Sequence, residues 1–274
     1  MNTILILALA QFWLICSISS AQRFVPLSYD QLNAQVKEIC DKNPLRCKLT
    51  IAQDEFGLPS PGLCGKDSQP CVTQILHITN FSNYDQNKAT RPEVYISGEL
   101  HGDERVGPHA AVEYARLLVE SSNPWIRRLV DTRSIFITPI TNSLGYDRNT
   151  REEGRVDTNR DYPIDQDAPM CMRAIASRIA NELYRSHMFQ VAITFHGGME
   201  AIAMEWGTKN RYAPSLHRSP DDYALMEIAG GLSDYAGPVA RYGRKYPFGR
   251  MNDLVYPVEG GSTYFVHRIL ENRE

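Results

Sequence analysis

The sequence lacks a strong net charge, internal repeats and low-complexity segments. Its 274 residues carry a formal net charge of −3, which gives no reason to expect nucleic acid or an anionic membrane surface as a partner. The absence of a repeat period argues against a repeat architecture. With 43% hydrophobic and 22% charged residues, the chain is long enough to bury a large core, and it fits one large α/β domain.

Long apolar runs are scarce, and the clearest one lies at the N-terminus. Residues 4–18 are almost wholly apolar, which is too short for a comfortable membrane span, and Ser19-Ser20-Ala21 supplies small residues for cleavage. Residues 1–21 are therefore predicted to be a signal peptide, although Lys and Arg are missing from its amino end. A retained membrane anchor is the alternative. We expect a secreted protein, or one in the lumen of the secretory pathway, without a stable membrane span in the mature chain.

Cysteine is sparse, and the spacing of the cysteines also bears on whether the protein is secreted. Five cysteines follow the predicted signal peptide: Cys40, Cys47, Cys64, Cys71 and Cys171. The first four cluster in a Pro/Gly-rich segment, which favours disulfides formed in an oxidising compartment and leaves their pairing open. A second zinc site is the alternative, but the six-residue gaps argue against it. Cys171 is left over.

Residues 94–108 form the stretch on which the functional argument rests. The apolar run from Val94 to Ser97 predicts a buried strand, and Gly98 ends it. His101 and Glu104 follow on a loop, and we expect Gly107-Pro108 to prevent an early helix, so that a helix covers 109–120. Ligands of α/β sheets lie beyond the carboxyl ends of strands. An imidazole and a carboxylate three residues apart can both reach one Zn²⁺ ion.

A second strand end completes the same set of ligands. The apolar run from Gln190 to Phe195 predicts a strand, and His196 follows it directly, before two glycines. His101, Glu104 and His196 together predict a zinc centre with three protein ligands, which leaves a fourth position for water or substrate. Such a centre is catalytic in type, and it would polarise a carbonyl group. A hydrogen-bonded structural histidine is the alternative for His196 alone.

The remaining patterns predict alternating strands and helices. Helices are expected at 27–40 and 171–187, strands at 73–79 and 134–140, and a polar connection at 84–91. This alternation predicts an α/β fold, a mixed β-sheet flanked by helices on both faces. We expect a signal peptide at 1–21, a Cys-containing segment at 22–72 and a catalytic domain at 73–274. Asn80-Phe81-Ser82 is a glycosylation sequon.

An arginine-rich segment lies between the predicted ligands. It contains four arginines, at 148, 151, 155 and 160, and Asn159-Arg160 stands directly before Asp-Tyr-Pro. A guanidinium beside an amide can hold a carboxylate through two parallel hydrogen bonds. An ordinary solvated loop is the alternative.

These pieces resemble the zinc carboxypeptidases of the pancreatic type. The resemblance rests on His101-x-x-Glu104, residues 157–163, the strand ending at His196, and Tyr256-Pro-Val-Glu-Gly-Gly-Ser262. It implies one zinc ion bound by His101, Glu104 and His196, and peptide or protein C-termini as partners. It further implies that Asn159 and Arg160 hold the terminal carboxylate, that Arg151 stabilises the oxyanion and that Tyr256 closes over the substrate. Arg148 and Arg155 are rivals for the oxyanion role.

The resemblance also leaves a gap. The family's general-base glutamate is expected after the position where this sequence stops, and Glu259, Glu271 and Glu274 do not stand in a matching context. We therefore expect a family member that lacks its final strand and hydrolyses peptides poorly. The alternatives are a non-catalytic relative that binds zinc and peptides, and an amide hydrolase acting on acylated amino acids.

Overall fold

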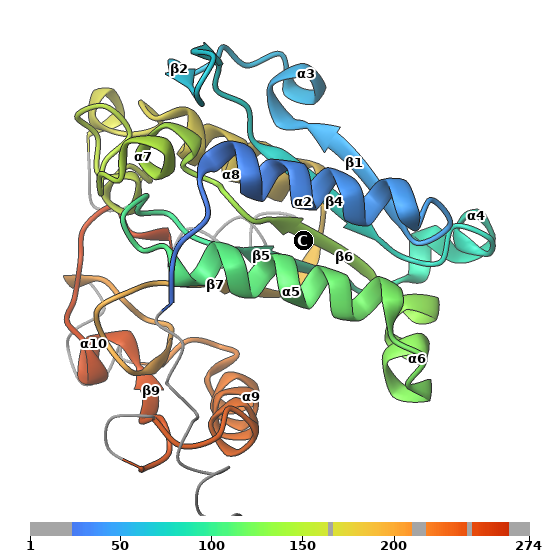
Figure 1. The fold of residues 1–274 in the computed structure, drawn as a ribbon. Coiled ribbons are helices and arrows are strands. Elements are labelled where there is room, and N and C mark those ends of the chain that lie inside the picture. The colour runs from blue at the N-terminus through green and yellow to red at the C-terminus, as the bar shows by residue number, and fades with distance from the viewer. Residues whose placement is uncertain (1–23, 164–166, 210–217, 240–242, 263–274) are drawn as a thin grey trace, which may run out of the picture.

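The computed structural model describes residues 24–163, 167–209, 218–239 and 243–262 (Figure 1). The predicted signal peptide, Glu271 and Glu274 lie outside these ranges. No helix in the described ranges is long and apolar enough to cross a membrane.

A mixed five-stranded sheet forms the centre of the fold. Its order is β1-β4-β6-β5-β7, with β1–β4 and β4–β6 antiparallel and β6–β5 and β5–β7 parallel. The bounds are β1 Cys47–Ile51, β4 Gln74–Ile78, β6 Ser134–Thr138, β5 Glu93–Ser97 and β7 Phe189–Thr194. Among the described strands, β7 pairs with β5 alone, so the strand that leads to His196 stands at the end of the sheet.

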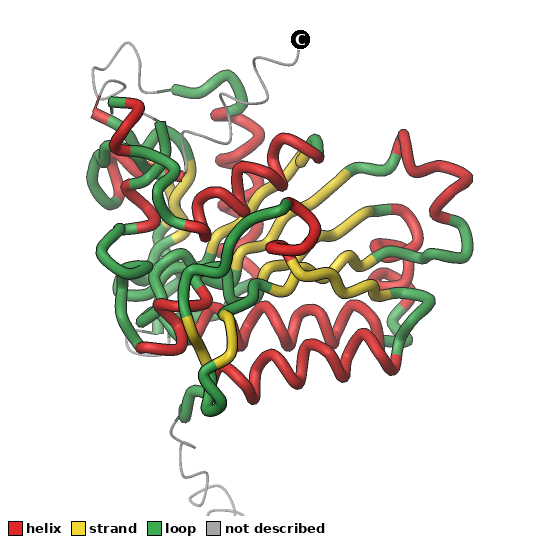
Figure 2. Tube along the Cα trace, turned by 90° about the horizontal axis from the view of Figure 1, so that it is seen from above, coloured by secondary structure: helices red, strands yellow, loops and turns green. Residues whose placement is uncertain are grey.

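Helices cover both faces of the sheet, as the sequence predicted (Figures 1 and 2). One face packs against α2 (Tyr29–Lys42) and α5 (Val106–Glu120), and the other packs against α8 (Ile175–Ser186). The pleat of β5 separates the two cores, because Ile96 joins the first and Tyr95 the second. Ser28 caps α2 through a reciprocal pair of hydrogen bonds with Gln31.

Shorter elements complete the described chain. They are α3 Ala52–Phe56, β2 Leu63–Cys64, β3 Gln69–Pro70, α4 Tyr84–Asn87, η1 Lys88–Thr90, α6 Pro124–Thr132, α7 Ser143–Arg148, η2 Thr158–Arg160, η3 Ala168–Met170, β8 Ile202–Met204, α9 Asp222–Tyr235, β9 Phe248–Arg250 and α10 Met251–Leu254. Strands β8 and β9 pair in parallel as a separate two-stranded sheet. Two helical turns, α4 and η1, therefore occupy the predicted polar connection.

Two predicted helix boundaries are wrong. Helix α5 begins at Val106, so Gly107 and Pro108 lie inside its first turn instead of preventing it. Proline is tolerated there because the first amide groups of a helix have no partner within it. Helix α8 begins at Ile175 and not at Cys171, because two carboxylates from the arginine-rich segment, described below, bind the amide groups at its start.

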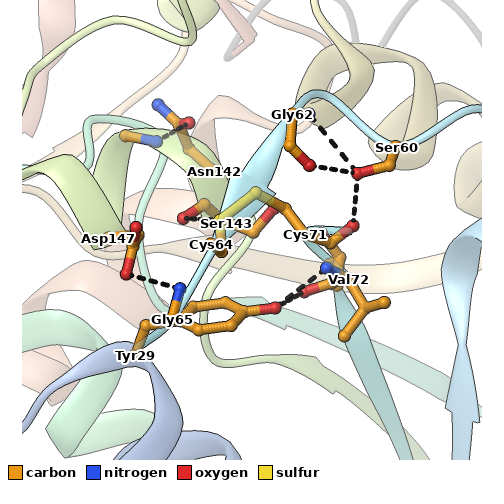
Figure 3. Close-up of a disulfide and its surroundings, with 12 residues drawn as sticks. Tyr29, Ser60, Gly62, Cys64, Gly65, Cys71, Val72, Asn142, Ser143 and Asp147 are labelled. Atoms are coloured by element: carbon orange, nitrogen blue, oxygen red, sulfur yellow. Dashed lines mark hydrogen bonds between the residues drawn. A yellow bond between two sulfur atoms is a disulfide. The ribbon is translucent and has the colours of Figure 1, made fainter. Parts of the chain in front are cut away.

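The clustered cysteines form two local disulfides. Cys40 bonds to Cys47, and Cys64 bonds to Cys71, which resolves the open pairing and rules out a zinc site built on these four residues. Figure 3 shows Cys64–Cys71 beside α2, where the Tyr29 hydroxyl donates to the carbonyl of Val72. Cys171 has a free thiol.

Candidate functional site

The site is assembled by the parallel pair β5 and β7. Ser97 lies opposite Thr194 in the register of these strands, so the chain leaves both strands at the same edge of the sheet. His101 follows β5 by four residues and His196 follows β7 by two, and their rings are 5.0 Å apart. The loop containing His101 is closely packed, since a Cβ on Gly102 would lie 2.0 Å from the backbone of Gly145.

The three predicted ligands converge. Nδ1 of His101 lies 2.9 Å from Oε1 of Glu104, and Nδ1 of His196 lies 2.9 Å from Oε2 of the same carboxylate. The possible ligand atoms of all three side chains lie within 4.8 Å of one another. Hydrogen bonds from both histidines lower the pKa of Glu104, although burial alone would raise it.

Asp157 orients the buried imidazole of His101. Its Oδ1 lies 3.1 Å from Nε2 of His101. Because burial is opposed by the carboxylates of Asp157 and Glu104, the pKa of His101 is raised. A carboxylate that accepts from Nε2–H leaves the lone pair of Nδ1 for a metal ion, as is usual for histidine ligands. In the sequence, Asp157 stands within residues 157–163, where no pattern assigned it a role.

Arg151 is the arginine that lies with the predicted ligands. Its Nε donates to Oδ2 of Asp157 at 3.0 Å, and its Nη1 is 3.7 Å from Oε1 of Glu104. The guanidinium of Arg148 instead approaches the position of Gly62, and Arg155 is exposed. Proximity therefore favours Arg151 over its two rivals.

Asn159 and Arg160 are held beside the same cluster. The amide N–H of Asn159 donates to Oδ1 of Asp157, which also contacts His101. The side-chain Oδ1 of Asn159 accepts from both the amide and the hydroxyl of Ser262, at 3.0 and 3.1 Å. The acceptor end of the Asn159 amide is therefore already occupied. Nη1 of Arg160 donates to the carbonyl of Asn159 at 2.6 Å.

Tyr256 lies on the segment of residues 256–262, which contains the Ser262 that is bonded to Asn159. A second contact holds the same segment, because the carbonyl of Gly260 accepts from the amide of Tyr162 at 3.0 Å. Tyr256 is 52% exposed. The structure thus joins the Tyr256 segment to Asn159 through Ser262, a contact that no spacing in the sequence indicated.

Two buried carboxylates fix the arginine-rich segment to the start of α8. Asp161 is fully buried and accepts from the amides of Arg173 and Ala174, at 3.1 and 2.8 Å, and from the Ser177 hydroxyl at 2.6 Å. Glu153 accepts from the first amides of the helix, at 2.5 and 3.0 Å. Because a helix start offers unpaired N–H groups and a positive potential, both carboxylates stabilise it.

We expect Asp161→Ala to lower the free energy of unfolding by about 2 kcal/mol, because it leaves buried amide donors without an acceptor. Urea denaturation followed by circular dichroism measures this loss. Asp167→Ala is the matched control, since Asp167 is exposed and its carboxylate caps nothing. Equal midpoints for the two variants would contradict the capping role.

The chemistry of this donor set fits zinc. Two imidazoles and one carboxylate are typical ligands of a catalytic zinc ion, and an outer carboxylate bound to one imidazole is its usual companion. His101, Glu104 and His196 would hold the ion, and Asp157 would orient His101.

Comparison with known proteins identifies the family. Residues 72–271 match the family model described as zinc carboxypeptidase, and the chain therefore belongs to that family. Carboxypeptidase D of Mus musculus is 25% identical over 178 residues, which cover 60% of this chain and 13% of the relative. Carboxypeptidase D of Rattus norvegicus gives the same values. The match thus spans a small part of these relatives' length.

Solved structures support the same fold. Carboxypeptidase A from Helicoverpa armigera superposes with a TM-score of 0.70 at 16% identity, covering 89% of this chain and 62% of that one. Bovine thrombin-activatable fibrinolysis inhibitor, in complex with a tick carboxypeptidase inhibitor, gives 0.66 at 15% identity, covering 90% and 84%. At this identity the likeness shows the architecture alone.

Proposed function

We propose that this protein is a secreted zinc-dependent carboxypeptidase that removes C-terminal residues from peptides. The observation that carries the proposal is the convergence of His101, Glu104 and His196 at adjacent strand ends, within 4.8 Å, in a chain of the zinc carboxypeptidase family. A zinc ion bound there would supply Lewis-acid activation of water and of the scissile carbonyl.

The remaining side chains suit the recognition of a peptide end. Arg160 and the NH₂ group of Asn159 would bind the terminal carboxylate, which fixes the scissile bond at one distance from the peptide end. Arg151 would donate to the carbonyl oxygen as negative charge develops on it. Tyr256 would close over the bound substrate from the neighbouring segment. This closure would exclude water from the charged contacts and strengthen them.

The test is turnover of N-acylated dipeptides by the secreted chain reconstituted with zinc. Cleavage is expected for substrates that end in a free carboxylate and not for the matching C-terminal amides, because Arg160 would lose its partner. Cleavage of acids and amides at equal rates would contradict this specificity. Release of acyl groups from single amino acids, without cleavage of dipeptides, would favour the amide-hydrolase alternative.

A non-catalytic peptide-binding protein is the second candidate. The observation that favours it concerns Glu259, whose carboxylate forms a 2.8 Å ion pair with Lys209, both side chains at least half exposed. Among the described residues this carboxylate therefore contacts Lys209 and not a candidate zinc ligand, and general acid–base assistance is worth about 10²–10⁴-fold in rate. Binding of a peptide acid, measured by calorimetry, together with turnover below the detection limit would establish this candidate over the first.

Secretion and glycosylation remain predictions of the sequence, although two findings bear on them. The two disulfides favour an oxidising compartment. Asn80 is partly buried, and its Nδ2 donates to Asp131 at 2.8 Å. A glycan would replace one of the two hydrogens on that nitrogen, so the bond to Asp131 would have to use the other hydrogen. The domain boundary at residue 72/73 also remains a prediction.

A further inference from the structure

The residues before α2 lie against the loop that carries the candidate metal ligand Glu104. We call residues 24–28 the N-terminal strap. In Figure 1 this blue segment runs past the beginning of α5. Its anchor is the backbone of Leu27, whose amide donates to Nε2 of His109 at 2.9 Å. The ring of Phe24 meets the same imidazole edge-on, with centroids 5.0 Å apart.

The strap contacts the side chain of Arg105 directly and its backbone through His109. The carbonyl of Leu27 accepts from Nη2 of Arg105 at 3.0 Å and from the hydroxyl of Tyr146 at 2.9 Å. Since Nε2 of His109 accepts from Leu27, the neutral ring carries its proton on Nδ1 and donates it to the carbonyl of Arg105, 2.8 Å away. Both the side chain and the backbone of Arg105 are therefore fixed by contacts that lead to the strap.

Arg105 also connects the loop that carries Glu104 with the arginine-rich segment. It directly follows Glu104, its guanidinium lies 4.0 Å above the ring of Tyr146, and its Nη1 donates to Oδ1 of Asn149 at 3.2 Å. Asn149 caps the carboxyl end of α7 in the left-handed conformation. Arg151, two residues further on, contacts both Glu104 and Asp157. One side chain thus connects the N-terminal strap, the Glu104 loop and the arginine-rich segment.

We infer that Arg105 is a positioning residue, which together with the N-terminal strap holds the Glu104 carboxylate between the two histidines for metal binding. The physical reason is geometric. Glu104 lies on a loop before a helix, where the backbone has few regular hydrogen bonds, so its orientation depends on the anchors of its neighbour. A carboxylate that is free to turn away must be ordered when the ion binds, and that entropy cost lowers the affinity.

This inference rests on the proposed zinc function, and zinc affinity tests it without reference to activity. The full secreted chain is compared with Arg105→Ala, Arg105→Lys and the control Arg116→Ala by competition with a chromogenic chelator. Arg116 lies on α5, the helix that begins directly after Arg105, and it pairs with Glu113 and Glu120 at the surface. Arg105→Ala is expected to raise the zinc dissociation constant about 10–100-fold, the range typical of residues that support a metal ligand. Arg105→Lys should lie between it and the wild type, and Arg116→Ala should match the wild type.

Urea denaturation in the presence of a chelator separates positioning from general stability. An Arg105→Ala chain that unfolds earlier but binds zinc as tightly as the wild type would overturn the inference. If Arg105→Ala does not fold, the zinc affinity of Tyr146→Phe tests the inference instead. This variant removes the hydrogen bond from the Tyr146 hydroxyl to Leu27 and keeps the ring beneath Arg105. A several-fold weaker zinc affinity in Tyr146→Phe supports the inference, and an unchanged affinity overturns it. Failure of the wild type itself to bind zinc would instead overturn the proposed function.

Discussion

His196→Ala is expected to reduce zinc affinity by more than 100-fold, because loss of an outer residue such as Asp157 already costs about 10–100-fold and this change removes a ligand. His101 and Glu104 would remain, and they form an incomplete site. Zinc content after dialysis, together with chelator competition, measures the effect. Asp157→Asn should fall between His196→Ala and the wild type, since His101 keeps a partner but loses its anionic acceptor.

The control for this series is His187→Ala. His187 lies at the opposite end of β7 and pairs with Glu93 at 3.0 Å, so its removal should leave zinc content unchanged. Equal zinc content in the wild type and His196→Ala would show that the site has been assigned to the wrong residues. Equal losses in His196→Ala and His187→Ala would instead indicate damage to the fold.

Arg160→Ala is expected to weaken binding of a peptide acid by about 2–5 kcal/mol, the usual cost of removing one partner of a desolvated charge pair. Binding of the corresponding peptide amide should change little, because the amide has no charge for the guanidinium to pair with. Calorimetric titration of both ligands into the zinc-loaded chain measures the difference. Arg160→Lys should recover part of the loss, since it restores the charge but not the two parallel hydrogen bonds.

Arg155→Ala is the matched control for that series, because Arg155 lies on the same segment and is exposed. Its affinity for the peptide acid should equal that of the wild type. A change of the same size for acid and amide in Arg160→Ala would mean that Arg160 supports the segment and does not read the carboxylate.

The sequence predicted the framework of the site because short-range patterns determine it. The apolar runs at 94–97 and 190–195 indicated strands, and both became parallel neighbours, so His101 and His196 meet where expected. The helix of residues 27–40 was placed within two residues of α2. Each of these predictions depends on the local alternation of apolar and polar side chains, which a single sequence contains.

The contacts that orient the site could not be predicted, because they join residues far apart in the chain. Asp157 contacts His101 across 56 positions, Ser262 contacts Asn159 across 103, and Leu27 lies 78 positions from Arg105. No periodicity links such residues. The misplaced start of α8 has a related cause, since the carboxylates of Asp161 and Glu153, 12 to 23 positions upstream, bind the amides there.

The parallel pairing of β5 with β7 has a consequence for the order of folding events. Glu93 pairs with Phe189, so the chain between these two residues must close into a loop before the strands can pair. Parallel contacts between residues so far apart in sequence form slowly. The His101 and His196 imidazoles come together at the same moment, whereas both disulfides join cysteines only seven positions apart. Capture of zinc during refolding would therefore report on completion of the sheet, while disulfide formation would report on local turns alone.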